Sequence, residues 1–346
     1  MHFSDLKYLL GCLPPFICWL GLYLGGWYSP GLLYFGFIIV PVIELFVPAS
    51  TFTEDETALA RKSTKIFFDI LLYLQVPMLY GILSYFVWQY IHAGWTTAEM
   101  IFSVINIGIL IGVTGINIAH ELGHRQAAFD RWMARVLLVP ALYSHYTLEH
   151  NYGHHLKVGT PEDPATARKN EPVYTFHWRS ISKGYFNAWA IEKKMLQQAG
   201  LSKWKNELIW SHVVQLVYLS AVFYFAGIGC VIALFLAALW GILFLETVNY
   251  IEHYGLVRKK LSSGRYEPMT EIHSWNSNHE LGRMILFELV RHADHHYQTT
   301  RKYQTLRHLD KSPQLPFGYP MSIMLALVPP LWFSLMNPRI EALQEG

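Results

Sequence analysis

The chain of 346 residues is more apolar than a typical soluble domain. Hydrophobic residues make up 52% of it and charged residues only 15%, and its mean hydropathy is +0.21. Because soluble domains usually carry about 25% charged residues, this composition indicates an integral membrane protein in contact with a lipid bilayer. The net charge of +2, without a basic run, argues against nucleic acid as a partner.

The cysteine content argues against several cofactor classes. All three cysteines, Cys12, Cys18 and Cys230, lie inside apolar runs, and we interpret them as small buried residues rather than ligands or disulfide partners. No C-x-x-C pair is present, so we expect no iron–sulfur or zinc-knuckle domain within the chain. The unusual feature of the composition is instead its 17 histidines.

Apolar runs of about 20 residues predict an all-α fold with a bundle of six transmembrane helices. Glycines and other turn residues, among them Gly25, Pro30 and Gly227, separate consecutive runs, so the six predicted helices form three hairpins. We expect one integral-membrane domain over residues 1–346. The predicted spans are 9–29, 31–50, 66–92, 100–119, 208–228 and 230–251.

The distribution of Lys and Arg predicts the orientation. None of the 27 lies at a hairpin tip, and none occurs from Ile66 to His124. Since positive residues favour the cytoplasmic side, we expect both termini and a histidine-rich cap, formed by segments 120–207 and 252–346, to face the cytoplasm. Two shorter apolar stretches, Val136–Tyr143 and Met321–Leu335, are predicted to be interfacial or re-entrant.

The first histidine cluster is His120-Glu121-Leu122-Gly123-His124, at the end of the fourth predicted span. Positions i and i+4 share one face of a helix, so the two imidazoles can converge on one metal ion. The same residues match the H-E-x-x-H motif of zinc metalloproteases, in which Glu121 would be the base. A membrane zinc hydrolase is therefore one alternative.

Three further clusters follow. They are His150, His154 and His155; the single His253 at the end of the last predicted span; and His292, His295 and His296. The clusters provide nine imidazoles in all, more than one ion can use, so they predict a centre with two metal ions. Nitrogen ligands suit iron, copper, zinc or nickel, so these residues do not select the metal.

The other histidines are interpreted as ordinary core or surface residues. These are His2, His92, His145, His177, His212, His273, His279 and His308. A structural protein that binds haem or copper is disfavoured, because the chain lacks C-x-x-C-H and Met-rich motifs.

Several acidic residues neighbour the clusters or lie in apolar runs. Ligating histidines commonly donate their other ring N–H to a carboxylate, and four acids adjoin predicted ligands in the sequence: Glu121, Glu149, Glu252 and Asp294. A carboxylate inside a membrane span is a functional candidate by default. Glu246 meets this criterion best, and Glu44 and Asp69 meet it more weakly.

The motifs H-E-L-G-H, E-H-N-Y-G-H-H, N-Y-I-E-H-Y-G and R-H-A-D-H-H resemble, in type and order, those of the membrane alkane 1-monooxygenases. The segment Gly159–Ala165 is also similar, and the resemblance covers the whole chain. Membrane desaturases and sterol or fatty-acid hydroxylases share three histidine motifs but typically lack the one that contains His253. Xylene monooxygenases are the relatives most easily confused with this family.

The resemblance implies terminal hydroxylation of medium- to long-chain n-alkanes to 1-alkanols, with O2 as co-substrate. It implies two non-haem irons, ligated by His120, His124, His150, His154, His155, His253, His292, His295 and His296. Electrons would come from rubredoxin, itself reduced by rubredoxin reductase, at the cytoplasmic face of a bacterial inner membrane. Because no rubredoxin domain precedes Gly346, we expect a separate donor. The alternative within this group is a di-iron oxidase that acts on aromatic methyl groups or fatty acyl chains.

Two features concern the substrate and the donor. An alkane offers no polar group, so its selection requires an apolar channel. Five glycines in or near the predicted spans either leave room for this channel or only permit close helix packing. They are Gly31, Gly36, Gly108, Gly112 and Gly115. Basic residues near the clusters either dock an acidic rubredoxin or only follow the positive-inside rule. They are Arg131, Arg135, Lys157, Arg291, Arg301 and Lys302.

Overall fold

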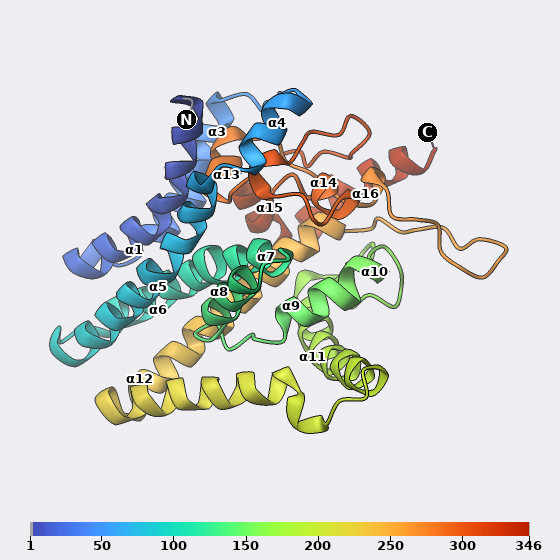
Figure 1. Cartoon of the computed structure of the whole chain (residues 1–346). Coiled ribbons are helices and arrows are strands. Elements are labelled where there is room, and N and C mark those ends of the chain that lie inside the picture. The colour runs from blue at the N-terminus through green and yellow to red at the C-terminus, as the bar shows by residue number, and fades with distance from the viewer. Residues whose placement is uncertain (1–2, 346) are drawn as a thin grey trace.

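The computed structural model describes residues 3–345, and over this range the fold is built from helices (Figure 1). No β-strand forms among these residues, where β-pairing is limited to two isolated bridges, Lys260 with Tyr266 and Asn276 with Gln314. The predicted all-α class is therefore confirmed. His2 lies outside the described residues.

Four helical stretches of the described chain are long and apolar enough to cross a membrane. The second of them has the boundaries predicted from the sequence, because its apolar run is bounded by Lys65 and by the turn at Ala93. The four are η1 (Phe3–Cys12) with α1 (Leu13–Leu24); α5 (Ile66–His92); the continuous α6 (Thr97–Leu110), η4 (Ile111–Ile116) and α7 (Asn117–Gly123); and α12 (Glu207–His253).

Helix α12 consists of two arms that meet at Gly227. This residue has φ 74° and ψ 177°, a conformation that glycine adopts without steric cost. Figure 1 shows the two arms, coloured yellow and gold, diverging from a sharp corner. The turn predicted between 208–228 and 230–251 is therefore present.

The second predicted span, 31–50, is shorter in the structure. It consists of α2 (Gly31–Tyr34), the π-helical η3 (Phe35–Ile39) and α3 (Val40–Phe46), and it ends because Val47 is extended. At about 1.5 Å per residue this stretch is about 24 Å long, less than the hydrocarbon core of about 30 Å. The prediction that this span reaches residue 50 was wrong.

Near the C-terminus, α15 (Tyr319–Ala326) and α16 (Pro329–Glu345) are bent by 118° relative to one another. Such a pair is either a broken span or a re-entrant loop. By length and composition, the described residues therefore contain four candidate spans, or up to five if this pair counts as one. The six predicted spans are not confirmed.

The remaining helices are short, except for α11, and most of them surround the histidine clusters. They are η2 (Gly26–Tyr28), α4 (Glu56–Ser63), α8 (Ala128–Leu138), α9 (Tyr146–Glu149), η5 (His150–His154), α10 (His155–Lys157), α11 (Val173–Gln198), η6 (Lys203–Lys205), η7 (Glu271–His273), α13 (Glu280–Ile285), α14 (His292–Tyr297) and η8 (Tyr303–Thr305).

Glycines let α6 and α12 approach closely. A Cβ atom added to Gly108 would lie 2.8 Å from the carbonyl oxygen of Ala237, and one added to Gly241 would lie 2.8 Å from the carbonyl oxygen of Gly108. Small residues of this kind permit close contact between membrane helices. The packing interpretation of Gly108 is therefore supported.

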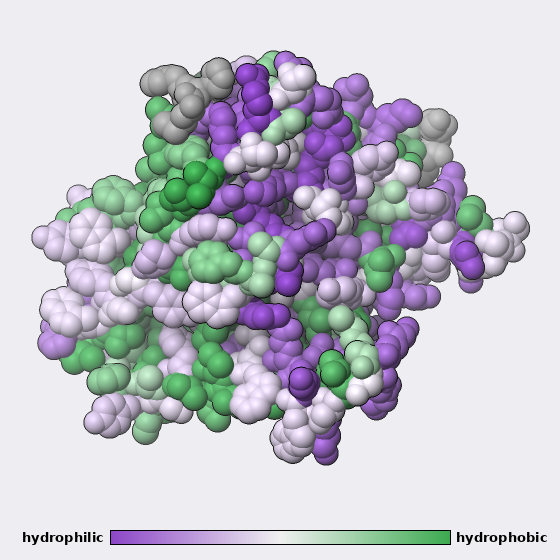
Figure 2. Space-filling view, viewed as in Figure 1, coloured by the Kyte–Doolittle hydropathy of each residue, from purple (hydrophilic) through white to green (hydrophobic). Residues whose placement is uncertain are grey.

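Polarity separates the two ends of the molecule. In Figure 2, hydrophobic residues gather at the left and lower left, over α1, α5, α6 and α12. Hydrophilic residues gather at the upper centre and right, over α13, α14 and the loops around them. This separation is typical of an apolar helix bundle that carries a polar cap.

Candidate metal centre

Four segments bring the nine clustered histidines together. The end of α7 supplies His120 and His124, η5 and α10 supply three, the end of α12 supplies His253, and α14 supplies three. The nine form two groups, and the ligand nitrogens within each group all lie within 4.8 Å of one another. The structure thus brings together every histidine that the sequence analysis selected.

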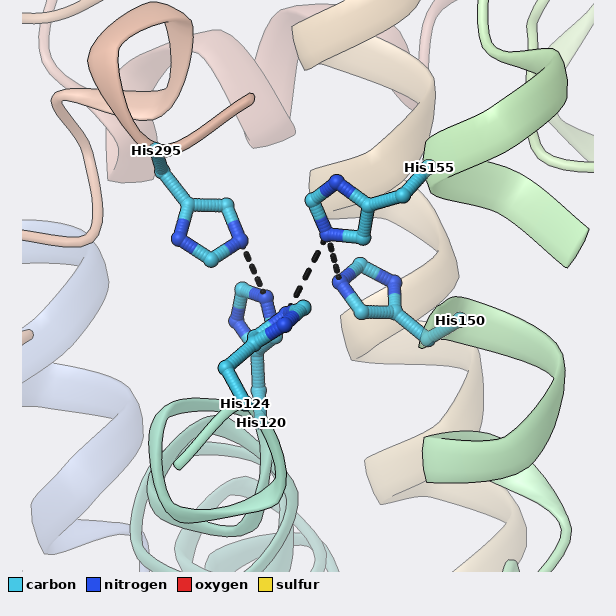
Figure 3. A group of neighbouring side chains, drawn as sticks. All are labelled: His120, His124, His150, His155 and His295. Carbon is cyan, nitrogen blue, oxygen red and sulfur yellow. Dashed lines mark hydrogen bonds between the residues drawn. The ribbon is translucent and has the colours of Figure 1, made fainter. Parts of the chain in front are cut away.

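The first group contains His120, His124, His150, His155 and His295. Their rings point toward one another from three directions, α7, η5 with α10, and α14 (Figure 3). The Nε2 atom of His155 lies 3.1 Å from that of His124 and 2.9 Å from that of His150. The Nε2 atoms of His120 and His295 are 2.9 Å apart.

The second group contains His154, His253, His292 and His296, all of which are buried. The Nε2 atom of His292 lies 3.1 Å from that of His253 and 2.9 Å from that of His296. The Nε2 atoms of His154 and His296 are 3.3 Å apart. The two groups adjoin, since the ring centroids of His155 and His296 are 4.4 Å apart.

A π-helix divides the second histidine cluster between the groups. In an α-helix His150 and His154 would share a face, as the i, i+4 spacing predicted. Segment η5 is instead π-helical, with i to i+5 hydrogen bonding, and it pairs His150 with His155. His154 therefore turns to the second group, and the two histidines do not share one face. The sequence had left open which ion each histidine would bind.

The separations between nitrogens fit ligands of a shared metal ion. Metal–imidazole bonds of about 2.0–2.1 Å at angles of roughly 90–110° place neighbouring ligand nitrogens about 2.9–3.4 Å apart. The six Nε2 separations fall between 2.9 and 3.3 Å. Each group thus has the geometry of a site for one cation.

The protonation of the first group agrees with this interpretation. Burial lowers the pKa of His150, His155 and His295 well below the ordinary value, and neighbouring histidines lower it further. Burial also lowers the pKa of His124 to about 3. These imidazoles are therefore neutral near pH 7, and their Nε2 lone pairs are available to a cation.

Asp163 is a partner of the centre that the sequence analysis did not single out. The Nδ1–H of His154 donates to Oδ2 of Asp163 at 2.9 Å, and both side chains are buried. Burial would raise the pKa of Asp163, but His154 and hydrogen bonds from Thr166 and Ala165 lower it. Asp163 is therefore ionised and directs the Nε2 lone pair of His154 toward the second group. The resemblance of Gly159–Ala165 was the one sequence signal that pointed to it.

Three of the four predicted acidic partners make their hydrogen bonds with other residues. Oε1 of Glu121 accepts from Nη2 of Arg125 at 3.0 Å, and Oε1 of Glu149 accepts from Asn187 at 2.9 Å. Asp294 accepts from the backbone and side chain of Arg307. The metalloprotease interpretation requires Glu121 beside a metal-bound water, so the pairing with Arg125 disfavours it.

Glu252 is the predicted acid that reaches the histidines. Its Oε2 lies 3.3 Å from Nε2 of His292, the nitrogen that faces the second group. Its Oε1 accepts a hydrogen bond from the Tyr319 hydroxyl at 2.7 Å. Glu252 therefore lies at the edge of the centre itself.

An apolar cavity leads to the centre from the helix bundle. Its volume is about 90 Å³, and its walls come mainly from aliphatic and aromatic side chains, including Leu32, Phe35, Ile109 and Phe244. Gly36 and Gly112 also line it, so both leave room, and Gly112 in addition permits close packing against Phe244. Among its lining residues are His120 of the first group and His292 of the second. The cavity thus ends where the two groups meet.

An open polar basin reaches the centre from another side. His124 and His155, the two partly exposed members of the first group, line it together with Arg125, Arg131 and Arg135. Arg131 and Arg135 are exposed. Arg135 forms an ion pair with Glu207, which also lines the basin, whereas Arg131 donates to backbone carbonyls.

Arg291, Arg301 and Lys302, which belong to the same predicted docking set, are less exposed. Arg291 is only 2% exposed, and its guanidinium donates to the backbone carbonyls of Leu306 and Phe52. Its burial disfavours a direct contact between Arg291 and a partner. Arg301 pairs with Asp294, and Lys302 pairs with Asp69.

Comparisons with known proteins agree with the motifs. The chain matches the fatty acid desaturase family over residues 94–323. It is 36% identical to the alkane 1-monooxygenase of Pseudomonas putida over 322 residues, which is 92% of this chain and 78% of that protein. It is 38% identical to alkane 1-monooxygenase 1 of Alcanivorax borkumensis over 330 residues, 95% and 79% of the two chains.

A more distant relative is the xylene/toluene monooxygenase hydroxylase component XylM of Pseudomonas putida, 28% identical over 290 residues, 82% of this chain and 76% of that protein. The alkane 1-monooxygenases are thus more similar to this chain, and the match covers most of both sequences. On this similarity, and with the order of its histidine motifs, the chain belongs to the alkane 1-monooxygenase family.

Proposed function

We propose that this protein hydroxylates the terminal methyl group of medium- to long-chain n-alkanes, with O2 as co-substrate and one iron ion in each histidine group. The observation that carries the proposal is the apolar cavity that ends on His120 and His292. These two residues belong to different groups, so a chain that fills the cavity would present its end to both. The names of the relatives, alkane 1-monooxygenases, agree with this substrate.

The donor set fits iron. Five imidazoles in the first group and four in the second provide nitrogen ligands, which suit iron among other divalent metals. The relatives are monooxygenases, a reaction that calls for a redox-active cofactor, and iron is one that these imidazoles can hold. Bound iron would supply the activation of O2, and the residues of the chain would hold the iron, position the substrate and exclude water.

The residues of the chain would position the substrate and exclude water. Polar groups are confined to the histidine end of the cavity, where Asn117, Asn249, Glu252 and Tyr319 line it. An alkane forms no hydrogen bonds, so its position would be set by the shape of the apolar walls. The hydrogen bond from Tyr319 holds Glu252 beside His292.

The direct test is metal analysis joined to a product assay. Protein purified and loaded with Fe(II) under anaerobic conditions should hold about two irons per chain, as two cation-sized groups require. It should convert octane or hexadecane to the 1-alkanol when O2 and a reductant are added. His279→Ala, which lies outside both groups, is the matched control for His120→Ala. Activity with zinc but not with iron would refute the proposal.

We also propose that rubredoxin, reduced by rubredoxin reductase, delivers electrons at the polar basin. His124 and His155 connect the basin to the first group, and positive charge on its rim would attract an acidic carrier. Arg131→Glu should raise the apparent KM for rubredoxin several-fold at low salt without loss of iron. Arg265→Glu, an exposed arginine in the loop after α12, should not. Equal behaviour of the two variants would place docking elsewhere.

We further propose that the protein lies in the inner membrane of a bacterium with its histidine groups on the cytoplasmic side. The apolar helices and the positive-inside rule support this orientation. A membrane-impermeant maleimide applied to cells with a permeabilised outer membrane should label Ala93→Cys, at the turn between α5 and α6, but not Ser263→Cys. The opposite labelling would invert the orientation.

A further inference from the structure

Alkane hydroxylation consumes protons as well as O2. The balanced reaction is R–CH3 + O2 + 2 H+ + 2 e− → R–CH2OH + H2O, in which one oxygen atom enters the C–H bond and the other leaves as water. The two electrons would come from the one-electron carrier of the proposed function, on which this inference rests. The walls of the alkane cavity are apolar and provide no chain of hydrogen-bonding groups. The protons therefore enter from another side of the centre, either through the polar basin beside His124 and His155 or by a second route.

A small polar cavity lies on the other side of the centre. Its volume is about 20 Å³, enough for one water molecule. Its wall includes His150 of the first group together with Glu246, His145 and Ser180. It shares two lining residues, Tyr146 and Asn249, with the alkane cavity.

Two buried polar atoms of this wall have no hydrogen-bond partner. One is Oε2 of Glu246, a residue 3% exposed, and the other is Nε2 of His145, a residue 6% exposed. Oε1 of Glu246 is already occupied, because it accepts from the Tyr143 hydroxyl at 3.0 Å and from Asn249 at 3.4 Å. The Ser180 hydroxyl lies within reach of the Glu246 carboxylate, and in this structure it donates to the carbonyl of His177 at 3.3 Å. Since unpaired buried polar atoms are costly, a water molecule that satisfies both is expected.

The small cavity also adjoins the protein surface. Pro164 lines both this cavity and an open groove beside α11. Asn187, in that groove, donates to Glu149 in the cavity wall at 2.9 Å. A row of polar groups therefore lines the small cavity: Asn187 reaches Glu149 from the groove, and Glu246 and Asn249 line the same cavity. Asn249 also lines the alkane cavity.

We propose that a water molecule bound between Glu246 and His145 joins this row, and that Glu246 is a positioning residue that passes protons from the surface groove to the centre. No hydrogen bond joins Glu246 to the ligand nitrogens of the described histidines, so it acts through the water, while Tyr143 and Asn249 hold its Oε1 in place. Its place inside the apolar arm of α12 also gives a reason for a carboxylate that a membrane helix would otherwise exclude.

The first test needs no activity. A cryo-electron microscopy structure of the iron-free protein, at a resolution that shows water, should contain one water between the Glu246 carboxylate and the His145 ring. An empty cavity, or one closed by repacking, would overturn the proposal.

The second test uses the iron-loaded protein and the variant Glu246→Gln, which keeps the size of the side chain but cannot carry a proton. Turnover with octane should fall by about 10²-fold. The solvent deuterium isotope effect should rise, and less octanol should form per O2 consumed. Iron content and the KM for octane should stay as in the wild type, and Glu246→Asp should restore part of the coupling.

The matched control is Asp130→Asn. Asp130 is also a buried carboxylate that accepts from a tyrosine hydroxyl, that of Tyr73, but it lies outside the cavity. It should change neither coupling nor isotope effect. If Glu246→Gln matches the wild type in both, the inference fails while the proposed function stands. If the iron-loaded wild type forms no alkanol at all, the proposed function fails.

Discussion

Replacement of Asp163 by asparagine should release iron from one histidine group and leave the other loaded. The wild-type carboxylate accepts the Nδ1–H of His154, so the Nε2 lone pair faces the second group. An asparagine can present its NH2 to Nδ1 instead. That contact favours the tautomer with its proton on Nε2, which cannot bind a metal ion.

The size of the effect follows from the contact. The hydrogen bond is 2.9 Å long, and the two side chains are only 1% and 0% exposed, so water cannot replace the lost acceptor. Loss of such a partner of a ligating histidine typically costs 10- to 100-fold in metal affinity, about 1.4–2.7 kcal/mol. The first group makes no hydrogen bond to Asp163 in the described structure and should keep its affinity.

Anaerobic competition with an Fe(II) chelator, followed by metal analysis, measures this difference. The wild type should release its two irons over a narrow range of chelator, whereas Asp163→Asn should release about one iron at a roughly 10- to 100-fold lower concentration. Thr166→Ala is the control for the loop, because it removes the 2.6 Å hydrogen bond to Asp163 and keeps the carboxylate. If Asp163→Asn binds two irons like the wild type, or if Thr166→Ala releases iron equally, the assignment of Asp163 is refuted.

Three further predictions concern other parts of the molecule. His120→Ala and His295→Ala should lose the iron of the first group, and His154→Ala should lose that of the second. Each variant should stay in the membrane but form no octanol, and full turnover by any one of them would remove that histidine from the centre. Gly241→Ala should destabilise the fold by about 1–3 kcal/mol because its Cβ would meet the Gly108 carbonyl oxygen, whereas Gly81→Ala, with open space around it, should not. If the two variants unfold at the same temperature in detergent, the close packing of α6 and α12 is contradicted. Glu121→Gln should keep iron but lower the unfolding temperature, since buried Arg125 loses part of its charge partner; loss of iron without loss of stability would return Glu121 to the centre.

Features decided by local composition could be predicted from the sequence. The apolar run of α5 ends where polar residues begin, so its boundaries were predicted as Ile66 and His92. The turn at Gly227 was predicted because glycine ends a helix without steric cost. The nine histidines were selected because their spacing at helix ends is rarely produced by chance. Each of these signals lies within a few neighbouring residues.

Features that depend on distant contacts were decided only by the tertiary structure. The π-helical turn of η5, packed between α7 and α11, assigns His150 and His154 to different groups, which residue spacing alone could not show. Arg291 is buried, and its guanidinium donates to the backbone carbonyls of Phe52 and Leu306, so its charge does not reach the surface. The pairing of Asp163 with His154 depends on the fold of the loop after η5. Local patterns identify which residues can bind a metal, but partner, exposure and side-chain direction depend on what packs against them.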